Sequence, residues 1–368
     1  MEYPAAPSVF FNDNRNKEPH LKNFIVFMGL GVCLAAAPAA EERISLAGFP
    51  GKIALFRMHE GAPYFSNAQD GNVRRYGLDG AFAAAIGRKG QGPQEVEQLL
   101  QFHFLGDRVY LVSPGSVAFF DRDGKFLEKR RIPFSGDVVF LKNGNCLRID
   151  SGFSAEPDGV PGIASQVVFL DRDFREIRVL VREKAKVTPG FQFEAVSPKV
   201  QVGYAEKSGR VFVSNPFRGA LISIYDEEGR PLGEINDPAV RPQRIPDSYK
   251  EKFVEALVQT APGGDRGMAQ ELLKRLHWAD VFPAMAGFSV DDPDGLWVKT
   301  YAERSGRRVF RKYSLRGDFL GEAELPDDGI DTADDQNFTA FDGGSYFYVY
   351  VGKDGEYGLY RQPAAARR

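Results

Sequence analysis

The sequence predicts an all-β fold, a six-bladed β-propeller with a short two-helix insertion between blades 4 and 5. Four short apolar strands recur about every 40–50 residues, which is the spacing of propeller blades. Helical periodicity is rare, whereas 30 Phe and 14 Tyr residues suit sheets packed face to face. One such unit cannot bury its own apolar face, so the units must stack against one another.

Alternation and turn residues place the strands of the first five units. We expect blade 1 at 53–57, 63–67, 73–78 and 82–86, and blade 2 at 101–105, 109–112, 117–121 and 126–132. Blades 3 and 4 follow at 138–141, 146–149, 166–171 and 176–181, and at 200–205, 211–214, 221–226 and 232–235. Blade 5 is expected at 287–290, 296–300, 309–315 and 319–324.

Glycine turns join the third and fourth strands of four of these units, because glycine accepts a positive φ at no steric cost. These turns are Asp79-Gly80, Asp123-Gly124, Glu228-Gly229 and Arg316-Gly317. In blade 3 the segment Asp171-Arg172-Asp173-Phe174 replaces the glycine turn. We interpret all of these turns as structural.

The sixth unit offers only three strands, at 338–341, 346–351 and 357–360. A strand-like segment at 43–47 precedes blade 1 and belongs to no unit. We therefore expect it to pair beside 357–360, which closes the ring and covers an exposed sheet edge. A loose N-terminal arm is the alternative. The propeller then spans 40–362, and 363–368 form a disordered tail.

One segment, 245–280, breaks the strand pattern and is expected to be the helical insertion. Ser248 and Glu251 have the spacing of a capping box, and Tyr249, Phe253 and Leu257 follow at helical intervals. A second helix is expected to carry three further apolar residues, Met268, Leu272 and Leu276. The insertion either packs onto the propeller or acts as a mobile lid.

The N-terminus has the features of a secretory signal peptide over 1–39. Lys22 precedes an apolar run that ends in the small-residue site Ala37-Pro38-Ala39. Residues 1–20 are polar and unusual for a leader, which suggests that translation starts near Leu21. Export to the bacterial periplasm or exterior follows, with no transmembrane segment after cleavage. Lipidation of Cys33 is the less favoured alternative.

The net charge of −3 gives no sign of the basic surface that nucleic-acid-binding proteins carry. The segment Ile86-Gly87-Arg88-Lys89-Gly90-Gln91-Gly92-Pro93 resembles the inter-blade loop of bacterial six-bladed propellers of the NHL-repeat-like and TolB-like group. The segment Phe282-Pro283-Ala284-Met285-Ala286-Gly287-Phe288 is similar to that group as well. The resemblance implies the fold and export, and it implies no particular activity.

Long connections from a fourth strand to the next blade are expected on one face of the ring, which is the usual place for binding. They offer the candidate ligand-binding residues Arg88, Lys89, Gln91, Arg275, His277 and Trp278. The alternative for each of these residues is packing of the insertion onto the ring. A protein, peptide or glycan ligand is expected.

No recognisable metal-ligand set or cofactor motif is present. His59, His103 and His277 fall in different units without ligand spacing, and the acidic run from Asp291 to Asp294 is interpreted as a solvated turn. We expect a binding module rather than an enzyme. The alternative is a hydrolase or lyase that uses carboxylates, calcium or zinc at the mouth of the central tunnel.

Overall fold

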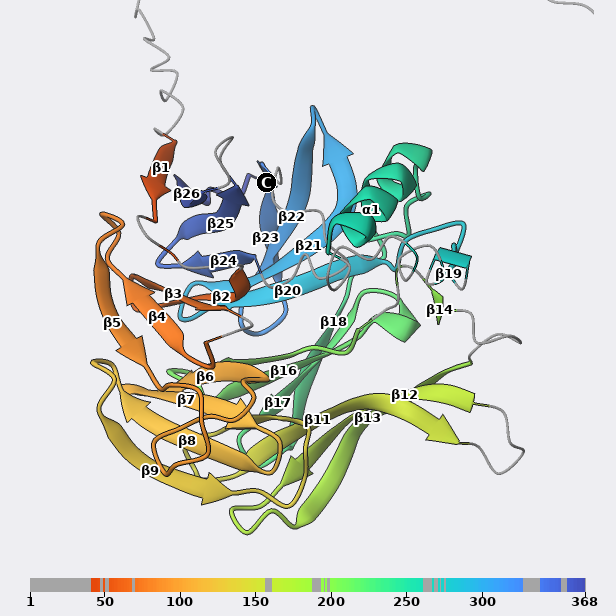
Figure 1. Cartoon of the computed structure of the whole chain (residues 1–368). Helices are drawn as coiled ribbons and strands as arrows, with labels where there is room; N and C mark the ends of the chain where they lie inside the picture. Colours follow the sequence, from red (N-terminus) through yellow and green to blue (C-terminus); the bar gives the residue numbers. More distant parts are fainter. Residues whose placement is uncertain are drawn as a thin grey trace, which may run out of the picture. The chain divides into compact units, whose positions relative to one another are not determined.

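The structure is a computed structural model that describes residues 41–46, 49, 53–67, 70–155, 161–186, 193–194, 196, 199–260, 267, 271, 273–274, 276–326, 338–351 and 356–367. The expected signal peptide, the alternative start and Cys33 lie outside the described residues. Most strands form six antiparallel four-stranded sheets (Figure 1). The chain is thus an all-β six-bladed propeller.

Blades 1 to 3 lie close to the positions expected from the sequence. Blade 1 consists of β2 (Ile53–His59), β3 (Ala62–Asn67), β4 (Val73–Tyr76) and β5 (Phe82–Ile86). Blade 2 consists of β6 (Gln101–Leu105), β7 (Arg108–Ser113), β8 (Ser116–Asp121) and β9 (Phe126–Arg131). Blade 3 consists of β10 (Asp137–Phe140), β11 (Cys146–Ala155), β12 (Pro161–Leu170) and β13 (Glu176–Lys186). Its last three strands are longer than expected, so part of the predicted loop at 150–165 is strand.

Blades 4 to 6 follow the same order. Blade 4 consists of β15 (Val202–Ala205), β16 (Arg210–Asn215), β17 (Leu221–Asp226) and β18 (Pro231–Asn236). Blade 5 consists of β20 (Met285–Asp291), β21 (Gly295–Arg304), β22 (Arg307–Tyr313) and β23 (Phe319–Leu325). Blade 6 consists of β24 (Thr339–Asp342), β25 (Ser345–Val351), β26 (Tyr357–Pro363) and β1 (Glu42–Ser45). A short 3-10 helix, η1 (Pro216–Arg218), lies between β16 and β17.

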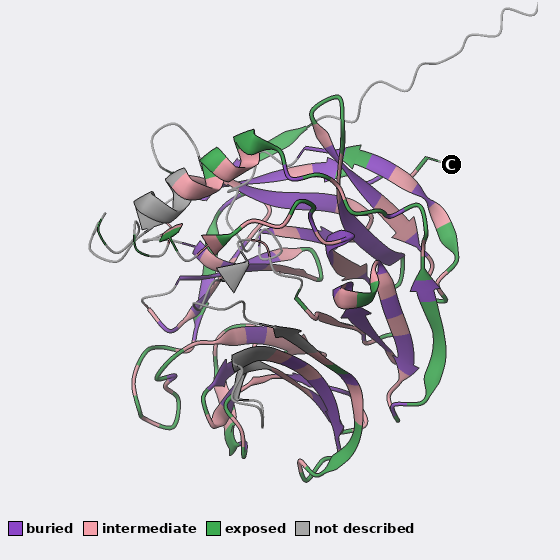
Figure 2. Cartoon of the chain, turned by 90° about the vertical axis from the view of Figure 1, so that its right-hand side faces the viewer, coloured by how far each residue is buried: buried purple, intermediate pink, exposed green. Residues whose placement is uncertain are grey.

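Six clusters of buried apolar side chains each join one blade to the next, and together they run around the whole ring. Between blades 5 and 6, for example, Trp297 stacks on Phe341 with ring centroids 4.6 Å apart. Figure 2 shows the buried positions along the strands, whereas the connections are mostly half-buried or exposed. The core is therefore divided among the blade interfaces, as expected for stacked units that cannot bury their faces alone.

The predicted closure of the ring is confirmed. β1 pairs with β26 in antiparallel register, with Ile44 opposite Leu359, and Figure 1 shows the two strands side by side. Ile44 is 5% exposed and packs with Phe56 of blade 1 and Phe347 of blade 6. The N-terminal segment thus supplies the fourth strand that blade 6 lacks.

Two expectations about the irregular segments differ from the structure. In chain order α1 (Asp247–Thr260) follows β18, but much of the second expected helix lies outside the described residues. Leu276, placed at the end of that helix, lies in β19 (Leu276–His277), which pairs in parallel with β14 (Phe193–Glu194). The tail expected to be disordered is ordered through Arg367, because the backbone of Arg367 forms two hydrogen bonds with Glu322 of β23.

Candidate functional site

A group of polar side chains lies on the first strands of three consecutive blades. Arg57 belongs to β2, Gln101 and His103 to β6, and Asp137 to β10. In a propeller the first strands are innermost and face the axis of the ring, so residues distant in sequence meet there. We call these four side chains the axial cluster.

Two polar contacts join the axial cluster across blade boundaries. Arg57 Nη2 donates to Gln101 Oε1 at 3.3 Å, from blade 1 to blade 2. His103 Nε2 lies 2.9 Å from Asp137 Oδ1, from blade 2 to blade 3. The same carboxylate oxygen accepts the backbone N–H of Val138 at 2.8 Å. A neutral imidazole that donates from Nε2 to a carboxylate keeps its lone pair on Nδ1.

Burial and mutual charge set the protonation of the axial cluster. Burial lowers the pKa of His103, against the opposing effect of the Asp137 carboxylate and with a smaller contribution from Arg57. Burial by itself would raise the pKa of Asp137, but His103 and Arg57 together lower it. Burial also lowers the pKa of Arg57, although a guanidinium stays charged at neutral pH. The cluster thus combines a cation, an anion and a neutral imidazole.

Arg57 is the least satisfied member of the axial cluster. Its Nε is buried and has no hydrogen-bond partner among the described residues. Its guanidinium carbon lies 5.7 Å from the centroid of the Phe102 ring. A buried donor without an acceptor is costly. A ligand that supplies an oxygen acceptor there would therefore gain a hydrogen bond without displacing a protein acceptor.

The alternation of side chains along β6 explains how the axial cluster forms, but the sequence alone does not predict the cluster. Phe102 and Phe104 pack into the core between blades 1 and 2, which turns His103 to the other face, toward blade 3. From the sequence alone, His103 is a candidate only for metal binding. The available signal was a polar residue inside an apolar first strand, repeated in three consecutive units, but the pairing depends on blade packing.

At the C-terminal ends of the first strands, the turns that follow these strands contact one another across blade boundaries. The backbone N–H of Gly106 in blade 2 donates to the Glu206 carboxylate of blade 4 at 2.8 Å, past blade 3. His59 Nε2 lies 3.2 Å from the carbonyl of Gly106. The N–H of Gly61 in blade 1 donates to Asp342 of blade 6 at 2.6 Å.

Two further contacts of this kind join blades 4, 5 and 6. The N–H of Lys207 in blade 4 donates to Asp292 of blade 5 at 2.6 Å. The N–H of Gly344 in blade 6 donates to Asp291 of blade 5 at 3.2 Å. Within the axial cluster, Gln101 and Asp137 begin β6 and β10 at the other end, where the long connections enter the blades, whereas His103 lies mid-strand and Arg57 lies nearer the far end of β2.

Three of the predicted site residues form one loop, between β5 and β6, and have partners inside it. Arg88 pairs with Glu95 at 2.9 Å, and Gln91 Nε2 donates to Glu97 at 3.3 Å. Lys89 forms an isolated parallel bridge with Val96. These contacts show how the loop holds its shape and do not test whether it binds a ligand.

The other predicted residues lie after blade 4. His277 is exposed in β19, and Trp278 packs edge-on against Phe253 of α1 with ring centroids 5.3 Å apart. Arg275 lies outside the described residues. In a ring of six blades, the connections after blades 1 and 4 are on opposite sides, and β5 and β19 are far apart in Figure 1. The structure therefore does not bring the two groups together.

The described histidines and acidic residues do not gather into a ligand group of the kind that holds a metal ion. Among the described residues, no group of three or more His, Cys, Asp or Glu could hold a metal ion. Asp291, the last residue of β20, is 2% exposed, whereas Pro293 and Asp294 of the following turn are exposed, as expected. Burial raises the pKa of Asp291, and the N–H of Gly344 opposes this effect.

Within the described ranges, no helix has the length and apolar character needed to span a bilayer.

Comparisons with known proteins support the fold. No family model matches the sequence, and no curated protein matches it. The structure is similar to that of a proposed exported protein from Bacteroides fragilis, with a TM-score of 0.52 and 15% identity over 88% of this chain and 94% of that one. At such identity the likeness concerns the fold alone.

Two more distant structures match at lower scores. BamB from Moraxella catarrhalis has a TM-score of 0.33 and 10% identity, over 84% of this chain and 85% of that one. A gluconolactonase from Xanthomonas campestris has a TM-score of 0.40 and 13% identity, over 89% of this chain and 99% of that one. We base no functional argument on either likeness.

Proposed function

We propose that the chain is an exported propeller of the NHL-like group that works as a binding module, with its ligand site on the face where the long connections enter the blades. The observation that carries this proposal is the axial cluster, because the half-buried Arg57 has a buried Nε with no hydrogen-bond partner among the described residues. Gln101 and Asp137 of the cluster lie at that end of their strands, while turn-to-turn contacts hold the opposite end. A peptide or glycan that presents an oxygen acceptor is the expected ligand.

The pairing of β14 with β19 supports this choice of face. It links the connection after blade 3 with the connection after blade 4, and Trp278 is held against Phe253. Connections that are already ordered lose little conformational entropy on association. We include His277 and Trp278 in the proposed surface, and place the loop of Arg88, Lys89 and Gln91 at its far side.

Peptide and glycan arrays, followed by titration of any hit, test the binding role. We expect Arg57→Gln and His103→Gln to weaken binding about tenfold, the cost of one hydrogen bond to a charged group. His59→Gln is the matched control, because His59 is a half-buried histidine on a first strand that contacts the Gly106 carbonyl and not the axial cluster. A ligand that binds all three variants as tightly as the parent protein would place the site elsewhere.

A hydrolase or lyase is the second candidate, because the His103–Asp137 pair resembles a general base held by a carboxylate. A panel of esters, lactones and glycosides tests it, and His103→Gln should abolish any turnover that His59→Gln leaves intact. Metal analysis of the purified protein is a separate check, since stoichiometric calcium or zinc would favour catalysis. Turnover that survives His103→Gln would rule out this base.

We propose the periplasm or the exterior as the location, from the leader-like segment before Ala40 and the likeness to a proposed exported protein. N-terminal sequencing of the protein recovered from the periplasmic fraction tests cleavage after Ala39. Retention of residues 21–39 on a soluble cytoplasmic product would contradict the proposal.

A further inference from the structure

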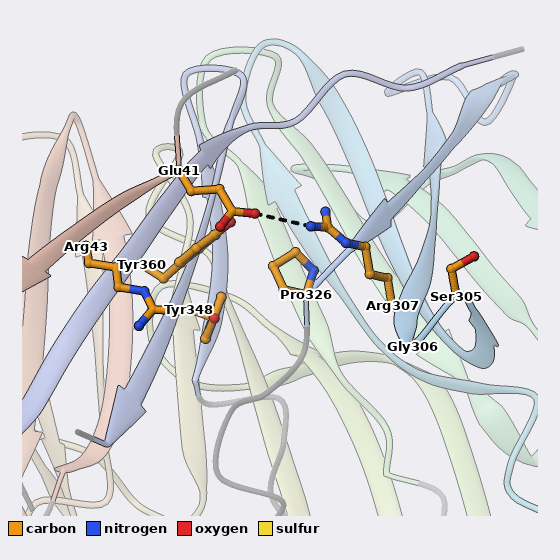
Figure 3. A pocket seen from close by; sticks show the side chains of 8 residues that line it. All are labelled: Glu41, Arg43, Ser305, Gly306, Arg307, Pro326, Tyr348 and Tyr360. Carbon is orange, nitrogen blue, oxygen red and sulfur yellow. Dashed lines mark hydrogen bonds and ion pairs between the residues drawn. The ribbon is translucent and has the colours of Figure 1, made fainter. Parts of the chain in front are cut away.

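A small cavity of about 190 Å³ lies at the interface of blades 5 and 6, away from the axial cluster (Figure 3). Blade 6 contributes a row of cross-strand neighbours, in which Arg43 of β1 is opposite Tyr360 of β26, and Tyr360 is opposite Tyr348 of β25. Blade 5 contributes Arg307, the first residue of β22. The other lining residues are Glu41, Ser305, Gly306 and Pro326.

The charges that line this cavity favour an anion. Arg43 and Arg307 bring two guanidinium groups, and among the described residues that line the cavity Glu41 is the one carboxylate. Glu41 pairs with Arg307 at 3.1 Å, as Figure 3 shows, and both side chains are nearly half exposed. Arg43 makes no ion pair with a described residue, and its guanidinium carbon lies 5.7 Å from the Tyr350 ring centroid. The lining thus has one positive charge in excess.

We propose that this cavity binds the carboxylate or phosphate group of a small ligand between Arg43 and Arg307, and that Glu41 occupies Arg307 as an internal competitor until the ligand displaces it. A planar guanidinium can donate two parallel hydrogen bonds to either group. The Glu41–Arg307 pair is weak, because water competes for side chains that are this exposed. Displacement therefore loses this weak pair together with the contact between the Glu41 carboxylate and the Tyr360 hydroxyl.

The size of the cavity and its tyrosines agree with this ligand class. A volume of about 190 Å³ equals about six water molecules, which holds a head group but not a drug-sized molecule. Burial and the neighbouring Glu41 carboxylate raise the pKa of Tyr360. Tyr360 therefore stays neutral and does not repel an anion, and its hydroxyl donates to Gln362 at 3.0 Å.

Titration calorimetry with inorganic phosphate and with succinate, at constant ionic strength, tests the proposal and separates the two anion sources. Glu41→Gln should tighten binding severalfold, because it removes the competing carboxylate. Arg307→Gln and Arg43→Gln should each weaken binding about tenfold. Arg307→Lys keeps the charge without the planar fork, and should restore only part of the affinity.

Arg361→Gln is the matched control for surface charge. Arg361 also lies on the β1–β26 pair and forms an ion pair with Glu42 at 3.5 Å, but it does not line the cavity. Its loss should leave binding unchanged. The proposal fails if neither anion binds saturably to the parent protein or to Glu41→Gln. It also fails if Glu41→Gln weakens binding, or if Arg361→Gln weakens it as much as Arg307→Gln.

Discussion

Replacing Gly80 by alanine should weaken the closure of the ring, because Gly80 touches the closing strand. Gly80 lies in the turn between β4 and β5 with φ +79°, and an added Cβ would meet the carbonyl oxygen of Ser45 in β1. Gly61, in the turn between β2 and β3 of the same blade, has φ +75° and nothing within 4 Å of such a Cβ. The two positions share a backbone conformation and differ in their surroundings.

The magnitude follows from that difference. An L-residue in the left-handed region costs about 1–2 kcal/mol, and the smaller entropy of the unfolded alanine chain offsets about 0.4–1 kcal/mol of it. Gly61→Ala should therefore lower the free energy of unfolding by about 1 kcal/mol. Gly80→Ala must also displace the backbone of β1, and forced overpacking costs about 1–3 kcal/mol more. We expect a total of about 2–4 kcal/mol.

Urea unfolding followed by tryptophan fluorescence measures this difference, since Trp297 is buried between blades 5 and 6. Hydrogen exchange adds a local measurement, in which Gly80→Ala should speed exchange of the β1 amides and Gly61→Ala should not. Equal midpoints for the two variants, with unchanged exchange in β1, would refute the steric argument.

Three further predictions concern the closing strand, the blade 3 turn and the buried histidines. Ile44→Asp should lower the melting temperature far more than Ser45→Asp, because Ile44 is buried and Ser45 is exposed; equal losses would contradict the closure. Phe174 has φ +62° and packs near Phe134, so Phe174→Gly should be about 1 kcal/mol more stable than Phe174→Ala in urea titrations. Burial lowers the pKa of His59 and His103, so the folded state binds fewer protons than the unfolded state below about pH 6.5. Stability should fall as the pH drops through that value, and His103→Gln should reduce this slope; an unchanged slope would contradict the assignment.

The strands could be predicted because their signals are local. An apolar run such as Val117 to Phe120, followed by a turn at Gly124, places a strand and its neighbour without knowledge of the rest of the chain. The missing strand of blade 6 could be predicted as well, because a closed ring of four-stranded blades requires a fourth strand in each blade. The order at Arg367 could not, since it depends on two hydrogen bonds with Glu322 of a different blade.

The turn glycines show the limit of local reasoning. The sequence explains Gly124 by its positive φ alone, yet an added Cβ would also clash with the carbonyl oxygen of Ala85 in the preceding blade. Phe174 takes the equivalent position in blade 3 because its ring packs near Phe134 and Phe140, which offsets the unfavourable φ. The axial cluster was missed for the same reason, since Arg57, His103 and Asp137 meet only after three blades stack.

The pairing of the first described strand with the last one affects how the protein can be made. During synthesis, β1 leaves the ribosome first, and its partner β26 emerges only when translation is nearly complete. Until then Ile44 lacks the partner strand that covers it in the finished ring. The open strand edges of the unfinished ring can meanwhile pair with another chain. Contacts across so long a stretch of sequence form slowly, so we expect nascent chains to depend on chaperones that cover these edges.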